Sequence, residues 1–169
     1  MVLGFADLKD AIQAVPAILQ FSPTALELLD HTVFLYSGKA EKGSLLFTEF
    51  SGRKAQARLE SCREKMTKLA SILEYASDEQ SLDRIWSARR GALNNIMKMT
   101  VGSRKPIGLI EDTVVPPSKL GEHCENILTA YRENRLNHVM YGHVGDGNMH
   151  TRPLIDISSK SESEMVCNL

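Results

Sequence analysis

Two histidines flank a glycine-rich turn in the segment GHVGDGNMH, residues 142–150. Glycine allows positive φ angles and the close approach of a ligand to the backbone. If the segment forms a hairpin, His143 and His150 lie at one end of a sheet, where two neutral imidazoles can bind Zn²⁺, Mn²⁺ or Fe²⁺. The third ligand would be Asp146 or a distant carboxylate, and open coordination positions could hold a substrate hydroxyl or carboxylate. The alternative is a tight hairpin in which Asp146 and Gly147 form the turn and the histidines are merely polar.

A second candidate lies in the segment WSARR, residues 86–90. The guanidinium of Arg89 or Arg90 could bind a carboxylate through two parallel hydrogen bonds. In the alternative interpretation both arginines lie on a solvated helix face, and Trp86 belongs to the core.

Further candidates flank the turn on both sides. Glu111 and Asp112, at the end of an expected strand, could perform acid–base chemistry or form local ion pairs. Arg152 follows His150 by two residues and would face the same side of a strand, where it could bind an anion. The remaining histidines lack partners nearby in the sequence and are assigned no role: His31, His123 and His138.

Hydrophobic periodicity predicts the elements that position these residues. The expected helices span residues 6–20, 23–30, 53–76, 77–99 and 118–134. The expected strands span residues 44–50, 107–115, 137–141 and 152–157. Residues 31–43 are expected to form a loop, and residues 158–169 resemble the beginning of a helix. This order predicts an α+β fold, with an antiparallel or mixed sheet and helices packed on one face.

Composition narrows the classes of protein that fit. A chain of 169 residues that is 43% hydrophobic and 24% charged is typical of one globular domain. Its net charge of −1, without a dense basic run, argues against nucleic-acid binding.

Cys62, Cys124 and Cys167 form no CxxC pair, which favours a reducing compartment. No apolar run approaches the roughly 18–20 residues of a membrane span, and residues 1–12 lack the basic start of a signal peptide. We therefore expect a cytoplasmic protein, or one attached to a membrane only through a partner.

Several segments together resemble a known family. GHVGDGNMH is similar to the GH(A/V/L)GDGN(L)H signature of FAD-linked oxidases of the vanillyl-alcohol-oxidase type. That family includes D-lactate dehydrogenases, the FAD subunit of glycolate oxidase and D-2-hydroxyglutarate dehydrogenases. IEDTVVPPSKL, residues 110–120, resembles the ED-x-x-VP-x-SKL segment that precedes the signature. Residues 22–30, 44–52 and 85–93 also resemble family segments in the family's order, so the likeness covers nearly the whole chain.

The resemblance implies a domain assignment. Residues 1–157 correspond to part of the C-terminal cap, or substrate, domain, a ferredoxin-like antiparallel sheet flanked by helices. Residues 158–169 would be the truncated start of the next helix or a disordered tail. In the family this domain packs over a flavin that a separate N-terminal domain binds.

The resemblance also implies roles for individual residues. His143 and His150 would be ligands of a divalent metal, zinc or manganese or iron, that orients a 2-hydroxy acid. Arg89 would contact the substrate carboxylate, and Asn148 would lie close to the flavin and substrate. Arg152 stands where relatives often carry a small polar residue that touches substrate, so the resemblance implies a substrate contact for it as well. Its His-Thr-Arg-Pro context is similar to that of the large members that also carry an iron–sulfur domain. No catalytic acid or base is assigned within the chain.

The function that follows is that of a substrate-binding cap in a flavin-dependent 2-hydroxy-acid dehydrogenase, with hydride transfer from substrate C2 to FAD. The chain is expected to be an inactive fragment, because it lacks a flavin-binding domain and the later Gly-Glu-His-Gly segment of the family. That segment supplies the carboxylate ligand and a histidine base. The expected partners are a small 2-hydroxy acid and an FAD-binding domain or subunit, and any attachment to a membrane would be through a respiratory partner. An iron–sulfur domain and a homodimer are left open. The alternative is a non-catalytic α+β binding or assembly module derived from such a cap.

Overall fold

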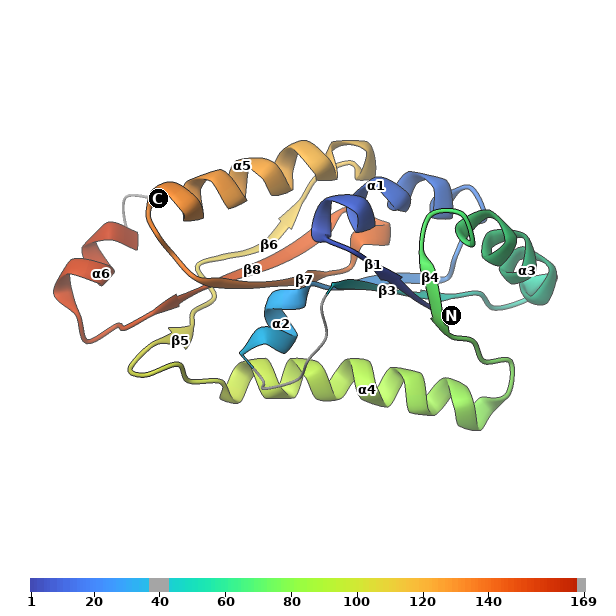
Figure 1. Cartoon of the computed structure of the whole chain (residues 1–169), viewed down its shortest axis with the longest axis horizontal. Helices are drawn as coiled ribbons and strands as arrows, with labels where there is room; N and C mark the ends of the chain where they lie inside the picture. Colours follow the sequence, from blue (N-terminus) through green and yellow to red (C-terminus); the bar gives the residue numbers. More distant parts are fainter. Residues whose placement is uncertain (37–42, 167–169) are drawn as a thin grey trace.

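The computed structural model describes residues 1–36 and 43–166 as one antiparallel sheet with helices on both faces (Figure 1). The strands are β1 Val2–Phe5, β2 Ala25–Leu29, β3 Ser44–Glu49, β4 Ser71–Glu74, β5 Lys105–Pro106, β6 Ile110–Val114, β7 His138–Gly142 and β8 Asn148–Ile155. They lie in the order β4-β1-β3-β2-β7-β8-β5, and β6 also pairs with β8. Every pairing is antiparallel in the described part of the chain, which confirms the α+β class.

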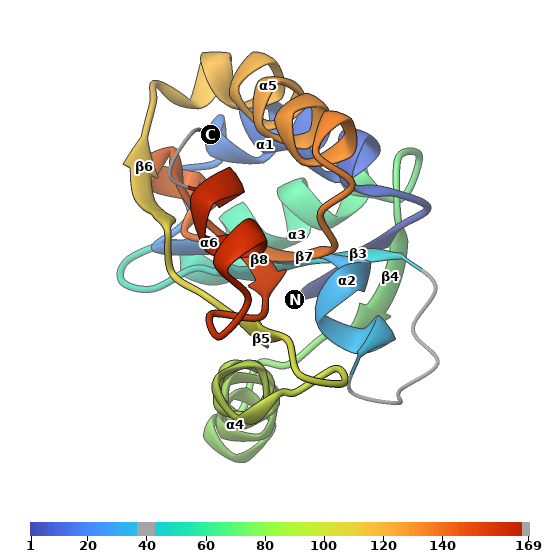
Figure 2. The same cartoon turned by 90° about the vertical axis from the view of Figure 1, so that its left-hand side faces the viewer.

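Helices cover the two faces of this sheet unequally. The helices are α1 Leu8–Leu19, α2 His31–Leu35, α3 Ala55–Met66, α4 Glu79–Lys98, α5 Leu120–Glu133 and α6 Lys160–Val166. Figure 2 shows α1 and α5 on one side of the sheet and α4 on the other. We expected helices on one face of the sheet. The sequence did not indicate that α2 and α4 cover the second face.

Two apolar cores follow from this arrangement. Alternate side chains of a strand point to opposite faces, so each strand contributes to both cores. In β2, Leu26 and Leu28 pack with α1, α3 and α5, whereas Leu29 packs with α2 and α4. The face that carries Leu29 is the face on which the polar residues of the candidate site gather.

Some predicted elements are wrong. Residues 23–30 were expected to be a helix but contain β2, because pairing with β3 and β7 on both sides outweighs the weak helical pattern of so short a segment. The expected helix 53–76 ends at Met66, and Ser71–Glu74 form β4 against β1. Leu73 is accordingly exposed.

The expected loop 31–43 begins with α2, and its Ser37-Gly38 and Lys42 lie outside the described residues, as does Cys167. Strand β1 was not predicted. The other expected helices and strands are confirmed, with boundaries shifted by a few residues; the strand expected at 107–115 is β6, and β5 precedes it. In the described ranges, no helix combines the length and the apolarity that a bilayer crossing requires.

The cysteine thiols of Cys62 and Cys124 are free and buried. Burial raises the pKa of Cys62 to about 11 and that of Cys124 to about 12. Since the thiolate is the reactive form, we expect both residues to resist alkylation by iodoacetamide at pH 8 in the native chain and to react in urea. Peptide mapping by mass spectrometry measures each site separately. Rapid labelling of either residue in the native chain would contradict the packing described here.

Candidate functional site

The turn between β7 and β8 brings the two histidines of the signature together. It contains a short 3₁₀ segment, η2 Val144–Asp146, and Gly147 has a φ of +74°. A Cβ on Gly147 would lie 1.8 Å from the carbonyl oxygen of Val115, so the backbone of the turn lies directly against the end of β6. Glycine is therefore required here both by the left-handed conformation and by the close approach.

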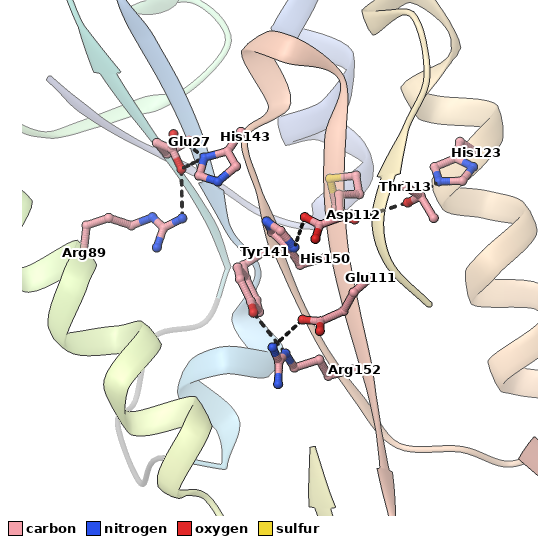
Figure 3. A network of polar contacts seen from close by, with 11 residues as sticks. Glu27, Arg89, Glu111, Asp112, Thr113, His123, Tyr141, His143, His150 and Arg152 are labelled. Atoms are coloured by element: carbon pink, nitrogen blue, oxygen red, sulfur yellow. Dashed lines mark hydrogen bonds and ion pairs between the residues drawn. The ribbon is translucent and has the colours of Figure 1, made fainter. Parts of the chain in front are cut away.

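Strand alternation places the candidate side chains on one face. Tyr141 of β7 and His150 of β8 are direct cross-strand partners, and Arg152 follows two residues later on the same side, as its spacing predicted. On the neighbouring strand β2, Glu27 shares the face of Leu29. Arg89 reaches this face from α4, which covers it (Figure 3). Residues from four separate elements thus meet on the face of the sheet that α4 covers.

His143 is held by a carboxylate that the sequence analysis did not single out. Its Nδ1 lies 2.7 Å and 2.8 Å from the two carboxylate oxygens of Glu27. The Nη2 of Arg89 donates to Glu27 at 2.8 Å. The Arg89 and Glu27 side chains are only 4% and 13% exposed, whereas the imidazole of His143 is 49% exposed. A buried ion pair therefore supports an imidazole that is open to solvent.

His150 has a different environment. Its ring stacks on Tyr141 at a centroid distance of 4.9 Å, and its Nδ1 lies 3.3 Å from Oδ1 of Asp112. Burial lowers the pKa of His150 and outweighs the opposing effect of the Asp112 carboxylate. This shift favours the neutral ring, which is the form that binds a metal ion.

A bulge in β6 explains how two consecutive carboxylates reach the same site. Between the β8 partners of Ile110 and Thr113, Glu111 and Asp112 both lie opposite His150, and Asp112 has a φ of +55°. An extra residue in one strand re-aims its side chains. Glu111 forms an ion pair with Arg152, and Asp112 pairs with His150. Local ion pairing, one of the two interpretations of this acidic pair, is observed between Glu111 and Arg152.

Arg152 lies on the side of the imidazole pair away from Glu27. Its Nε donates to the hydroxyl of Tyr141 at 3.0 Å, and its guanidinium also contacts Glu111. Tyr141 thus joins the ring of His150 to the guanidinium of Arg152 (Figure 3).

The two imidazoles lie edge to face with a centroid distance of 5.4 Å. In Figure 3 the Nδ1 atoms of the two rings point away from one another, toward Glu27 on one side and Asp112 on the other. A carboxylate on Nδ1 leaves Nε2 free, which is the usual arrangement of a metal-binding histidine. The three carboxylates and two guanidiniums of this network sum to −1, which favours a dication.

The donor set therefore fits two of the ligands of a divalent metal. Within residues 1–36 and 43–166, no three His, Cys, Asp or Glu side chains converge as a ready ligand set. Asp146, one of the suggested third ligands, is exposed.

The remaining predicted residues lie as follows. Asn148 begins β8, and its side-chain oxygen is buried without a hydrogen-bond partner among the described residues. Arg90 is exposed and bonds only to Ser87 among the described residues, so the solvated-face interpretation holds for Arg90 but not for Arg89. The three histidines without an assigned role have structural partners: Asp30 for His31, Thr113 for His123 and Tyr131 for His138.

Sequence reasoning missed Glu27 and Tyr141. The available signal for Glu27 was a single carboxylate in the apolar run ALELL, residues 25–29, which is unusual if the run is a buried strand. The expectation of a helix at 23–30 concealed it.

Comparisons with known proteins identify the family of this chain. The family model described as FAD linked oxidases, C-terminal domain, matches residues 1–168. The chain is 32% identical over 92 residues to D-2-hydroxyglutarate dehydrogenase of Haemophilus influenzae, covering 54% of this chain and 9% of that protein. It is 27% identical to glycolate oxidase subunit GlcD of Bacillus subtilis, covering 92% and 33% of the two chains. It is 28% identical to a probable mitochondrial D-lactate dehydrogenase of Danio rerio, covering 98% and 35%.

The chain thus spans about a third or less of the length of these curated relatives. Because the family model matches nearly every residue, the chain belongs to the family of C-terminal domains of FAD-linked oxidases.

Proposed function

We propose that this chain is the substrate-binding part of a flavin-dependent 2-hydroxy-acid dehydrogenase, in which hydride passes from substrate C2 to FAD. The relatives are named as dehydrogenases or oxidases of D-2-hydroxyglutarate, glycolate and D-lactate, which are all 2-hydroxy acids. Since the chain covers only part of those proteins, FAD is assigned mainly to a domain or subunit outside it. The flavin, when bound, supplies the redox chemistry as the hydride acceptor.

The observation that carries the proposal is the pair of imidazoles whose Nδ1 atoms each face a carboxylate. We assign His143 and His150 as two ligands of a divalent metal, zinc or manganese or iron, through their Nε2 atoms. The chemistry that such an ion supplies is a lower pKa for a hydroxyl that it coordinates. The two side chains would thereby fix the position of the substrate 2-hydroxyl.

The arginines on either side of the imidazole pair are assigned to the substrate carboxylate. Arg152 is held by Tyr141 and Glu111, and Arg89 by Glu27, so each guanidinium has a fixed orientation. A carboxylate held in this way fixes which substrate atom faces the flavin. Asn148 is assigned to the flavin side of the site, where its side-chain oxygen, which has no partner in the described part of the chain, could accept a hydrogen bond. An iron–sulfur domain, a homodimer and a cytoplasmic location stay predictions of the sequence.

The test is to replace His143 or His150 by alanine in a protein that joins this chain to its FAD-binding domain. We expect kcat/KM for a panel of 2-hydroxy acids, D-lactate among them, to fall roughly 100-fold or more, with FAD content unchanged. His123→Ala is the matched control, because that histidine bonds to Thr113 and lies outside the imidazole pair.

Full activity in both histidine variants would contradict the metal assignment. If the wild-type protein binds FAD but none of the 2-hydroxy acids reduces that FAD, the result would favour the non-catalytic module instead.

A further inference from the structure

The backbone itself places Glu27 opposite His143. Strands β2 and β7 are antiparallel, with Leu28 paired to Gly142 and Leu29 to Tyr141. Continuing this register by one residue brings Glu27 to His143. Their contact therefore follows from the pairing of two central strands and not from the reach of a long, mobile side chain.

The hydrogen bond between these two side chains fixes the position of a proton. Both oxygens of Glu27 lie within hydrogen-bond distance of Nδ1 of His143, at 2.7 Å and 2.8 Å. An ionised carboxylate can only accept, so Nδ1 must donate and carries the proton. In the neutral ring the lone pair is then on Nε2.

Arg89 completes the arrangement from the helix that covers this face. Its Nη2 donates to the Oε2 atom of Glu27 at 2.8 Å, and the residue is 3% exposed. The guanidinium balances the charge of a carboxylate that is itself largely buried, and it fixes the direction in which that carboxylate accepts. Two donors, Arg89 and His143, thus share the two oxygens of one acceptor.

The second imidazole lacks an equivalent support. The contact between His150 and Asp112 is longer, at 3.3 Å, and the Asp112 side chain is 77% exposed. Solvent weakens such an exposed pair. The two histidines are therefore held unequally, His143 by the largely buried carboxylate of Glu27 and His150 by the exposed carboxylate of Asp112. The effects of a buried and an exposed carboxylate can thus be compared within one chain.

We propose that Glu27, held by Arg89, is a positioning residue that keeps His143 in the tautomer with Nε2 free to bind a ligand. The inference rests on the proposed function in one respect, namely that this ligand is a divalent metal. The tautomer itself is a property of the chain without metal.

The first measurement is long-range ¹H–¹⁵N NMR of the imidazoles in the ¹⁵N-labelled chain at pH 7.5 without metal. We expect His143 to carry its proton on Nδ1 in the wild type and to change to the Nε2–H form in Glu27→Ala. Glu27→Gln should give a mixture of the two tautomers, because the amide has a single acceptor oxygen for the two donors, Arg89 and His143. Glu49→Gln, on the neighbouring strand β3, is the matched control and should leave the tautomer unchanged.

The proposal is overturned if wild-type His143 carries its proton on Nε2. It is also overturned if the folded Glu27→Ala chain keeps the Nδ1–H form. If Glu27→Ala does not fold, a wild-type tautomer ratio in Glu27→Gln overturns it equally.

The second measurement is a Zn²⁺ titration of the same chains by calorimetry. We expect Glu27→Ala to weaken Zn²⁺ binding about tenfold or more, and Asp112→Ala to weaken it less. His143→Ala and His150→Ala should abolish binding at the same concentrations. Zn²⁺ binding that survives both histidine substitutions would contradict the proposed metal site but leave the tautomer result standing. Binding that depends on both histidines yet is unchanged in Glu27→Ala would instead contradict the role of Glu27 toward the metal.

Discussion

Replacing Asp30 by alanine is expected to lower the free energy of unfolding by about 3–7 kcal/mol. Its side chain is 1% exposed and accepts hydrogen bonds from the buried hydroxyls of Ser44 and Thr32, both at 2.7 Å. It also accepts from the backbone N–H of Thr32 as the N-cap of α2. Alanine would leave two buried hydroxyls without their acceptor, at about 1–3 kcal/mol each, and would remove a cap worth about 1 kcal/mol.

The loss would spread beyond α2 because Asp30 joins several elements. Ser44 begins β3, and Thr32 also accepts from the backbone N–H of Met140 in β7. The backbone N–H of Asp30 donates to the carbonyl oxygen of Met140. The same two strands, β2 and β7, carry Glu27 and His143, so this network also stabilises the strand pairing on which the candidate site depends.

Urea denaturation followed by circular dichroism measures the effect. Asp78→Ala is the matched control, because the Asp78 side chain caps α4 by accepting an exposed hydrogen bond from the N–H of Ser81. That control is expected to lose only about 1 kcal/mol. A loss in Asp30→Ala no larger than in Asp78→Ala would show that the buried network contributes little.

The contribution of Asp30 also depends on pH. Burial alone would raise the pKa of Asp30, but the hydrogen bonds from Ser44 and Thr32, together with His31, hold it below the usual value. A carboxyl with a depressed pKa in the folded state stabilises the protein fully above the unfolded pKa of about 4 and loses that stabilisation as the pH falls further. The stability difference between the wild type and Asp30→Asn should therefore be larger at pH 7 than at pH 3.

The parts of the site that lie close together in the sequence could be predicted. His143, His150 and Arg152 belong to one turn and the strand that follows it, so residue spacing alone indicates their common face. The role of the turn glycines could also be predicted, because it follows from residue type within the same short segment. These predictions required only local geometry.

The parts that depend on pairing between distant strands could not be predicted. Glu27 meets His143 because β2 pairs with β7, and nothing in residues 22–30 alone distinguishes that strand from a short helix. Glu111 and Asp112 would point to opposite faces in a regular strand, and only the bulge in β6 directs both to the site. The inward direction of Arg89 and the outward direction of Arg90 likewise depend on where α4 packs.

Replacing Gly147 by alanine is expected to disrupt the turn and the imidazole pair together. The left-handed φ of +74° costs an alanine about 1 kcal/mol, and its Cβ would overlap the carbonyl oxygen of Val115. The overlapped oxygen belongs to the backbone, and the N–H of Val115 donates to the carbonyl oxygen of Gly147 at 3.0 Å. The turn and the end of β6 therefore cannot move apart without breaking this hydrogen bond. Overpacking of this kind adds roughly 1–3 kcal/mol. We expect a total loss of about 2–4 kcal/mol and weaker Zn²⁺ binding, because the turn sets the distance between His143 and His150.

Two glycines of the chain separate the contributions to that loss. Gly102 has a φ of +63°, and a Cβ added there would meet nothing within 4 Å, so Gly102→Ala should show the conformational cost alone. Gly121, in α5, has ordinary helical geometry and open space, so alanine there should stabilise the chain by up to about 1 kcal/mol. If Gly147→Ala loses no more stability than Gly102→Ala and binds Zn²⁺ as the wild type does, the close approach of the turn to β6 is not what positions the two histidines. A larger loss in Gly147→Ala, accompanied by weaker Zn²⁺ binding, means that the end of β6 holds the turn in the geometry that brings the imidazoles together.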